Sequence, residues 1–187
     1  TEGRYDLILI GMPEPSSGQA NRFFTLEFFK LCRERLKPDG IVALKIQAAE
    51  NRWTPQMMER ALSIHGALLS VFGNVLIIPG DTDVVTASLV SLPGDPQVLV
   101  ERLRSRGIRS RLISEPFIRY LLTNDRFSEV GETVRTRTAP LNTDRRPICY
   151  QLTSLLWLSK FYPALTALSF GDIESLMKGK RTWIAAA

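Results

Sequence analysis

The most informative part of the sequence is Tyr5-Asp6-Leu7-Ile8-Leu9-Ile10-Gly11, followed by Met12-Pro13-Glu14-Pro15 and then by Ser16-Ser17-Gly18-Gln19-Ala20-Asn21-Arg22-Phe23-Phe24. Its first part is a nearly continuous apolar run, typical of a strand that is covered on both faces in a parallel sheet. A loop rich in Pro, Gly and Ser ends this run, and a helical pattern follows it. Open α/β sheets bind ligands at the carboxyl ends of their strands. The sequence therefore predicts a functional site between Gly11 and Phe24.

Downstream of this stretch, the sequence predicts alternating helices and strands. A helix begins after Thr25, a good N-terminal cap, and ends at the stop residues Lys37-Pro38-Asp39-Gly40. Thr54-Pro55 begins another helix, which Gly73-Asn74 ends. The further elements are strands at 41–46, 75–78 and 84–90, a turn at 79–83, and helices at 95–106 and 115–122. The order of elements predicts an α/β fold.

The composition is that of one globular domain with a basic surface. The chain has 187 residues, of which 44% are hydrophobic and 23% are charged, which is enough to bury a core. Its net charge of +5 comes mostly from residues 101–146, which hold eleven arginines and six acidic residues. No aromatic-interleaved basic motif accompanies them. We interpret these arginines as a solvated surface and expect no nucleic-acid partner.

Isolated reactive residues give little support for other chemistry. Cys32, in a helical pattern, and Cys149, in a strand-like one, lack metal-ligand spacing and predict two core thiols in a reducing compartment. His65 lies among apolar helical neighbours, which favours a structural histidine over a triad or a metal ligand. Asp81-Thr82-Asp83 fits a hairpin turn better than a calcium loop. We therefore expect no metal site.

The carboxyl-terminal part, residues 151–187, is predicted as a helical segment that follows a domain at 1–150. Lys160 and Pro163 interrupt the apolar run from Leu152 to Leu168, which favours an amphipathic helix that packs on the domain or lies at an interface. The basic and aromatic residues of 178–187 resemble the cytoplasmic foot of a transmembrane helix, and an ordinary soluble tail is the alternative. Because the sequence also starts without methionine, we expect it to be a fragment that forms a cytoplasmic domain. If residues 178–187 are the foot of a transmembrane helix, this domain belongs to an inner-membrane protein.

The chain resembles the spermidine synthases, a family of polyamine aminopropyltransferases. The match begins with the strand and loop quoted above, continues through Glu27-Phe28-Phe29, and is closer still to synthase-like domains of multi-span membrane proteins, which carry a motif similar to Gln19-Ala20-Asn21-Arg22-Phe23-Phe24-Thr25. It extends to Leu36-Lys37-Pro38-Asp39-Gly40, Ala49-Glu50-Asn51 and Asn142-Thr143-Asp144-Arg145-Arg146-Pro147. The resemblance covers most of residues 4–150, and its specificity lies in the combination of these motifs.

The resemblance implies the second half of a Rossmann-like, S-adenosylmethionine-dependent methyltransferase type sheet. In this half, parallel strands are followed by a last antiparallel hairpin, and helices flank the sheet. The first half, with its nucleotide-binding glycine motif, is missing from the sequence. Strand 5–10 is therefore expected to form an exposed apolar edge, which we predict to pair with another chain, as in a homo-oligomer, or to be covered otherwise. For Asn142-Thr143-Asp144-Arg145-Arg146-Pro147, the interpretation is a contact between aspartate and arginine within the loop.

The resemblance also implies a reaction, the transfer of an aminopropyl group from decarboxylated S-adenosylmethionine to a polyamine. The attacking amine must lose a proton, and the family uses an aspartate at the strand end for this purpose. That aspartate falls on Gly11, and a second acid falls on Glu14. Loss of a general base typically lowers the rate by a factor of about 100 to 10,000. Glu14 is then the remaining candidate for a catalytic and substrate-binding carboxylate, although Pro13 and Pro15 restrict its backbone.

The remaining site residues are also carried over from the family. Candidates for contact with the adenosyl co-substrate are Gly11, Met12, Gln19, Ala20 and Phe23, and Glu50 is a candidate for binding the amine. Solvated loop positions are the alternative for Glu14 and Glu50, and core packing is the alternative for Phe23. Two other functions remain open: a non-catalytic domain that binds a polyamine or nucleoside or only assembles, and a small-molecule methyltransferase.

Overall fold

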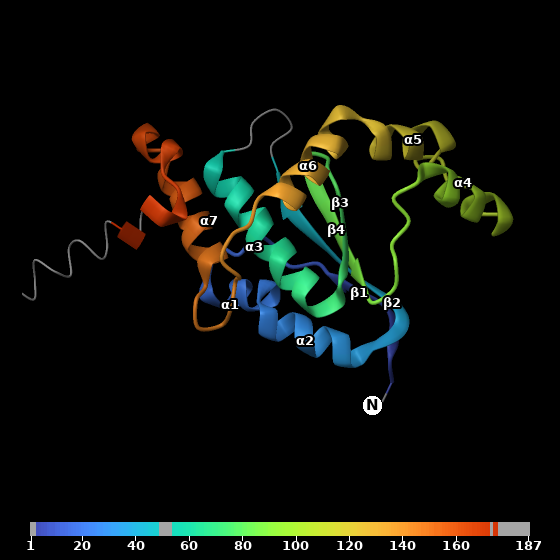
Figure 1. The fold of residues 1–187 in the computed structure, drawn as a ribbon, viewed down its shortest axis with the longest axis horizontal. Coiled ribbons are helices and arrows are strands. Elements are labelled where there is room, and N and C mark those ends of the chain that lie inside the picture. Colours follow the sequence, from blue (N-terminus) through green and yellow to red (C-terminus); the bar gives the residue numbers. More distant parts are fainter. Residues whose placement is uncertain (1–2, 49–53, 173, 176–187) are drawn as a thin grey trace, which may run out of the picture.

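The computed structural model describes residues 3–48, 54–172 and 174–175 as an α/β domain (Figure 1). Its elements are, in chain order, β1 (Tyr5–Ile10), α1 (Gly18–Asn21), η1 (Arg22–Phe24), α2 (Leu26–Arg35), β2 (Leu36–Gln47), α3 (Pro55–Phe72), β3 (Asn74–Ile78), β4 (Thr82–Ser88), α4 (Pro96–Ser105), α5 (Glu115–Thr123), α6 (Asp125–Thr136), α7 (Ile148–Leu158) and η2 (Pro163–Ala167).

The four strands form one mixed sheet in the order β1-β2-β4-β3. β1 is parallel to β2, whereas β4 runs antiparallel to both β2 and β3. A parallel strand pair followed by an antiparallel hairpin is consistent with part of a Rossmann-like methyltransferase type sheet. The predicted fold class is confirmed.

The first strand lies at the edge of the sheet in the described part of the chain. Ile8 and Ile10 point toward the core, but Tyr5, Leu7 and Leu9 on the other face are exposed, Leu9 by 71%. The expectation that the apolar run is covered on both faces is therefore wrong, while the expected exposed edge is confirmed. The physical reason is that no described element packs on the outer side of β1.

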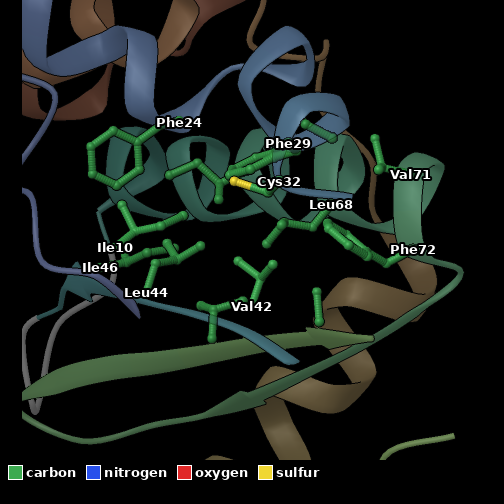
Figure 2. Packing of buried hydrophobic residues seen from close by; sticks show 14 of the residues in the cluster. Ile10, Phe24, Phe29, Cys32, Val42, Leu44, Ile46, Leu68, Val71 and Phe72 are labelled. Carbon is green, nitrogen blue, oxygen red and sulfur yellow. The ribbon is translucent and has the colours of Figure 1, made fainter. Parts of the chain in front are cut away.

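The main core lies between the sheet and helices α2 and α3. Figure 2 shows Phe24, Phe29, Cys32 and Leu68 from the helical layer facing Ile10, Val42, Leu44 and Ile46 from the strands. Phe29 and Leu68 are fully buried, so each removes a large apolar surface from water. This packing fixes β1 and β2 against α3 and thereby places the loops at the carboxyl ends of both strands.

The predicted boundaries of the helices are confirmed by their caps, with one difference at β2. Thr25 and Thr54 accept hydrogen bonds from Phe28 N and Met57 N, and Gly73 ends α3 in the left-handed conformation. The predicted stop residues 37–40, however, belong to β2, because pairing with β1 extends the strand back to Leu36. A Cβ atom on Gly40 would lie 2.9 Å from the Tyr5 carbonyl oxygen, so this close strand pair requires glycine.

Two features of the second half differ from the sequence analysis. Helix α6 was not predicted, although Asn124 caps it by accepting from Phe127 N at 2.8 Å. Cys149 lies in α7 and not in a strand, because its apolar neighbours pack as one helical face on α3. Both cysteines are free, buried thiols, as predicted. Burial raises the pKa of Cys149 to about 12 and that of Cys32 to about 11.

The carboxyl-terminal segment packs on the domain. Helix α7 crosses residue 150, and the buried Gln56 of α3 donates to the carbonyl oxygens of Leu165, Thr166 and Leu168. Within the described ranges, none of the helices has the length and apolar character needed to cross a bilayer. The basic and aromatic residues of 178–187 lie outside the described residues.

Candidate functional site

The loop after β1 lies at the carboxyl ends of the two parallel strands, as predicted. Gly11 is exposed, and a Cβ atom built on it would have open space around it. Met12 packs against the main core. Helix α1 follows the loop, and its cap Ser17 accepts a hydrogen bond from Ala20 N at 3.1 Å. Glu14 lies in this loop, between the end of β1 and the start of α1.

The Glu14 carboxylate is held by two side chains from neighbouring elements. Oε1 lies 2.9 Å from Nη1 of Arg60 in α3. Gln47, at the end of β2, donates to both carboxylate oxygens at 3.0 and 3.2 Å when its amide nitrogen is turned toward Glu14. Glu14 therefore joins the ends of β1 and β2 to the first turns of α3.

Arg60 is the buried centre of this group, with only 1% of its side chain exposed, against 32% for Glu14. Its Nη1 also donates to Thr153 Oγ1 of α7 at 3.1 Å, and Nη2 donates to the Gln47 carbonyl oxygen at 2.9 Å. Nε has no partner among the described residues. A buried guanidinium needs a nearby negative charge to offset its desolvation, and Glu14 supplies that charge. Glu14 is thus already paired before any ligand binds.

A cavity of about 760 Å³ opens beside Glu14 and extends along α7. Its walls are mainly apolar, with Met57, Leu156, Trp157 and Leu158 among them. Glu14 and Lys160 are the charged side chains that line it within the described part of the chain. The centroids of the Trp157 and Phe161 rings lie 5.0 Å apart. Apolar walls with few polar groups are typical of small-molecule sites.

Of the five predicted adenosyl-contact residues, Gly11 and Met12 lie in the same loop as Glu14, whereas Gln19, Ala20 and Phe23 lie in the helical turns that follow. Gln19 and Phe23 line a second cavity of about 470 Å³, together with Thr25, Glu27, Phe28, Leu31, Arg22 and Asp144. Ala20 is buried, in a helix that contacts α7. No described residue lines both cavities. The structure therefore places Glu14 in one cavity and Gln19 and Phe23 in another, and Glu50 lies outside the described residues.

The motif at 142–147 has a structural role. Asn142 is fully buried; it donates to the Phe24 carbonyl oxygen at 2.9 Å and accepts from Cys149 N at 3.2 Å. Asp144 accepts from the Thr25 hydroxyl at 2.9 Å. The predicted contact between aspartate and arginine is wrong for the described residues, because the partner of Asp144 is the cap of α2. The motif fastens α7 to the start of α2 and so shapes the second cavity.

The other titratable candidates, His65 and Asp83, have structural roles. His65 is buried in α3, and this burial lowers its pKa. Asp83, the last residue of the predicted turn at 79–83, lies in β4; its carboxylate accepts from Gly80 N at 3.2 Å and lies 3.6 Å from Arg126. Burial is the largest influence on Asp83 and raises its pKa. Within the described ranges, no three His, Cys, Asp or Glu side chains are grouped as a metal site would require.

The residues of this site that were not predicted from the sequence are Gln47, Arg60, Thr153 and Trp157. A signal for Arg60 was present, because it lies four and eight residues before the buried Ile64 and Leu68 on one face of α3. A charge in an apolar helical stripe requires a partner of opposite charge, and Glu14 had already been singled out. The role of α7 had no such signal, because it comes from a contact between segments that lie far apart in the sequence.

Two known proteins of the same name match about half of the chain. The chain is 32% identical over 114 residues to a polyamine aminopropyltransferase of Pyrobaculum calidifontis, and the match covers 57% of the chain and 39% of that protein. It is 26% identical over 105 residues to a polyamine aminopropyltransferase of Oceanobacillus iheyensis, with 52% of the chain and 20% of that protein covered. The match therefore spans well under half the length of either relative. No protein-family model matches the chain. These similarities support a spermidine synthase-like relationship for about half of the chain.

Proposed function

We propose that this chain is a spermidine synthase-like domain that binds an aliphatic amine, of the polyamine class, in the cavity beside Glu14 and does not itself catalyse aminopropyl transfer. The observation that carries this proposal concerns Gly11 and Glu14, the two positions at which the family has acidic residues. Gly11 brings no carboxylate, and the Glu14 carboxylate is bound by Arg60 and Gln47. A general base must receive the proton of the attacking amine. A carboxylate that already binds Arg60 and Gln47 is better suited to accept a hydrogen bond from a bound ammonium group than to take up its proton.

Glu14 supports the choice of an amine, whereas Lys160, which lines the same cavity, would repel an ammonium group placed beside it. An ammonium group can donate to the exposed part of the Glu14 carboxylate, while the methylene chain lies along Met57, Leu156 and Leu158. Trp157 lines the same cavity, and an indole face attracts cations. The names of the two relatives also point to polyamines, which supports the class of ligand.

The described residues do not fit decarboxylated S-adenosylmethionine at the same place. This compound would supply the aminopropyl group, and it must lie next to the amine for transfer to occur. Of the five residues that the family resemblance assigns to it, Gln19 and Phe23 line the other cavity and Ala20 is buried, while Gly11 and Met12 lie in the loop of Glu14. The proposal therefore includes no transfer step.

The test of amine binding is calorimetric titration of the chain with putrescine and spermidine, with butanediol as an uncharged analogue of putrescine. We expect the amines and not the diol to bind. Trp157→Ala should weaken binding without loss of fold, because this side chain is largely exposed. Glu14→Gln should weaken it about 10- to 100-fold, the usual effect of losing a charged hydrogen-bond acceptor. The matched control Glu27→Gln, in the second cavity, should bind as the parent does. Equal binding of diol and diamine would contradict the proposal.

The test of the non-catalytic part uses Gly11→Asp, which restores the missing carboxylate where a side chain has open space. We expect tighter binding of amines and no transfer from decarboxylated S-adenosylmethionine. A large gain of aminopropyl transfer in this variant would show that the rest of an active site is intact. That result would replace our proposal with an enzyme that lacks one group.

We also propose that the free edge of β1 pairs with a strand of a second copy of the chain. The apolar residues Tyr5, Leu7 and Leu9 are exposed, and β1 has a partner strand on only one side among the described residues. Unpaired backbone groups beside exposed apolar side chains favour pairing with another strand.

A further inference from the structure

The segment that joins α4 to α5 exposes arginines and large apolar side chains together. We call residues 106–113 the basic-apolar loop. Its side chains are exposed throughout, and Leu112 reaches 83%, the highest exposure of the large apolar residues described. Phe117 and Tyr120 are also exposed on the adjoining helix α5. In Figure 1, α4 and α5 lie at one end of the molecule, away from α7 and the cavity beside Glu14.

Folding of the domain does not explain these apolar residues. Helices α4 and α5 already have a core of their own, in which Val100, Ile118 and Leu122 pack together and against Ile78 of β3. Ile108, Leu112 and Ile113 lie outside this cluster and are each more than half exposed. Contiguous exposed apolar residues beside charged ones mark an interaction surface.

The charges of this surface are not balanced locally. Glu115 pairs with Arg104 and with Arg119, and these two contacts lower its pKa. Within the described ranges, Arg106, Arg109 and Arg111 have no acidic side chain at ion-pair distance. The basic-apolar loop therefore carries three guanidinium groups that are available to an anionic partner.

We propose that the basic-apolar loop docks this domain on the surface of an anionic lipid membrane. Guanidinium groups bind lipid phosphates, while projecting aliphatic side chains enter the boundary of the acyl region. An acidic peptide would need a groove for its own side chains, whereas Leu112 projects into solvent. Single-stranded nucleic acid is bound mainly by aromatic side chains between the charges, whereas this loop carries aliphatic ones. The combination thus fits a bilayer better than either polymer.

The experiment is co-sedimentation of the chain with vesicles of phosphatidylcholine alone and of equal parts phosphatidylcholine and phosphatidylglycerol. We expect binding only to the mixed vesicles, and weaker binding as the salt concentration rises. The triple variant Arg106→Gln, Arg109→Gln, Arg111→Gln should bind about 100-fold more weakly, because each arginine near an anionic surface contributes about fivefold. The double variant Leu112→Ser, Ile113→Ser should also bind more weakly, with an unchanged melting temperature because both side chains are exposed.

The matched control is Arg4→Gln, Lys30→Gln, Arg35→Gln, which removes the same charge from exposed positions outside the loop. This control should retain most of the binding. An equal loss in the control would show a general charge effect and overturn the proposal. Loss in the arginine variant with none in the double variant would indicate a soluble polyanion as the partner and would also overturn it, as would an absence of binding to the mixed vesicles.

Discussion

The Glu14 carboxylate lies 2.9 Å from Nη1 of Arg60, and this ion pair joins the loop after β1 to the buried side of α3. The same guanidinium reaches Gln47 of β2 and Thr153 of α7. The loop after β1, strand β2, helix α3 and helix α7 therefore meet at the Arg60 guanidinium. Glu14 offsets the cost of burying Arg60, so the residue that lines the cavity is also a structural residue.

We expect the effects of substituting Glu14 and Arg60 on the free energy of unfolding to depend strongly on each other. Glu14→Gln leaves a buried guanidinium unpaired and should lower the free energy of unfolding by about 2–4 kcal/mol. Arg60→Met should cost less, about 1–3 kcal/mol, because Glu14 is partly exposed and can be hydrated. The double variant should cost less than the sum, as measured by urea denaturation in a double-mutant cycle. The control is Asp6→Asn, which removes an exposed pair with Lys37 at 2.8 Å and should change the free energy of unfolding far less than Glu14→Gln does. Additive effects of Glu14→Gln and Arg60→Met would contradict the coupling.

Asn142 should be the residue of its motif that matters most for stability. Asn142→Ala leaves the Phe24 carbonyl and the Cys149 N–H without their partners in a buried place, which should cost about 2–4 kcal/mol in the free energy of unfolding. Thr143→Ala is the matched control, since its hydroxyl accepts one hydrogen bond from Arg146 N in an exposed turn. If thermal or urea unfolding shows equal costs for both variants, the structural role assigned to Asn142 is wrong.

Asp83 should make the stability depend on pH in an unusual direction. Burial raises the pKa of Asp83 in the folded state above its usual value of 3.8. The folded state therefore holds this proton more tightly, and the stability that it contributes is present below pH 3.8 and is lost as pH rises through the raised pKa. Asp83→Asn keeps an acceptor for Gly80 N and removes this titration. Urea denaturation from pH 4 to pH 7 should show that the variant loses less stability than the parent as the pH rises. An identical pH profile for parent and variant would rule out this linkage.

The free edge of β1 should control self-association. Leu9→Lys places a charge on an exposed edge residue and should leave the free energy of unfolding within about 0.5 kcal/mol of the parent. Sedimentation velocity should show that the parent associates as its concentration rises and that the variant does so less. Leu69→Lys, on an exposed part of α3, is the matched control and should associate as the parent does. A parent that remains a monomer at high concentration would refute pairing through β1.

Local sequence determined most of the elements, because their signals are local. Thr25, Thr54, Asp95 and Ser114 each cap the helix that the sequence predicts after them, and Gly73 ends α3 with a positive φ angle. The apolar runs gave the strands, and the family resemblance implied their order and the antiparallel hairpin. The loop between Gly11 and Phe24 could also be located in this way, since a strand end followed by a helix start is visible in the sequence.

Which side chains meet depends on how the elements pack together. This packing separated Gln19 and Phe23 from Glu14, brought Arg60 to that carboxylate and Thr153 to Arg60, and left Leu7 and Leu9 exposed. It also turned the strand-like pattern around Cys149 into a helix, because α7 packs on α3. Caps and apolar periods act over a few residues, whereas a buried charge or an uncovered strand face depends on segments that are distant in sequence. That difference in range is why the elements could be predicted and the environment of Glu14 could not.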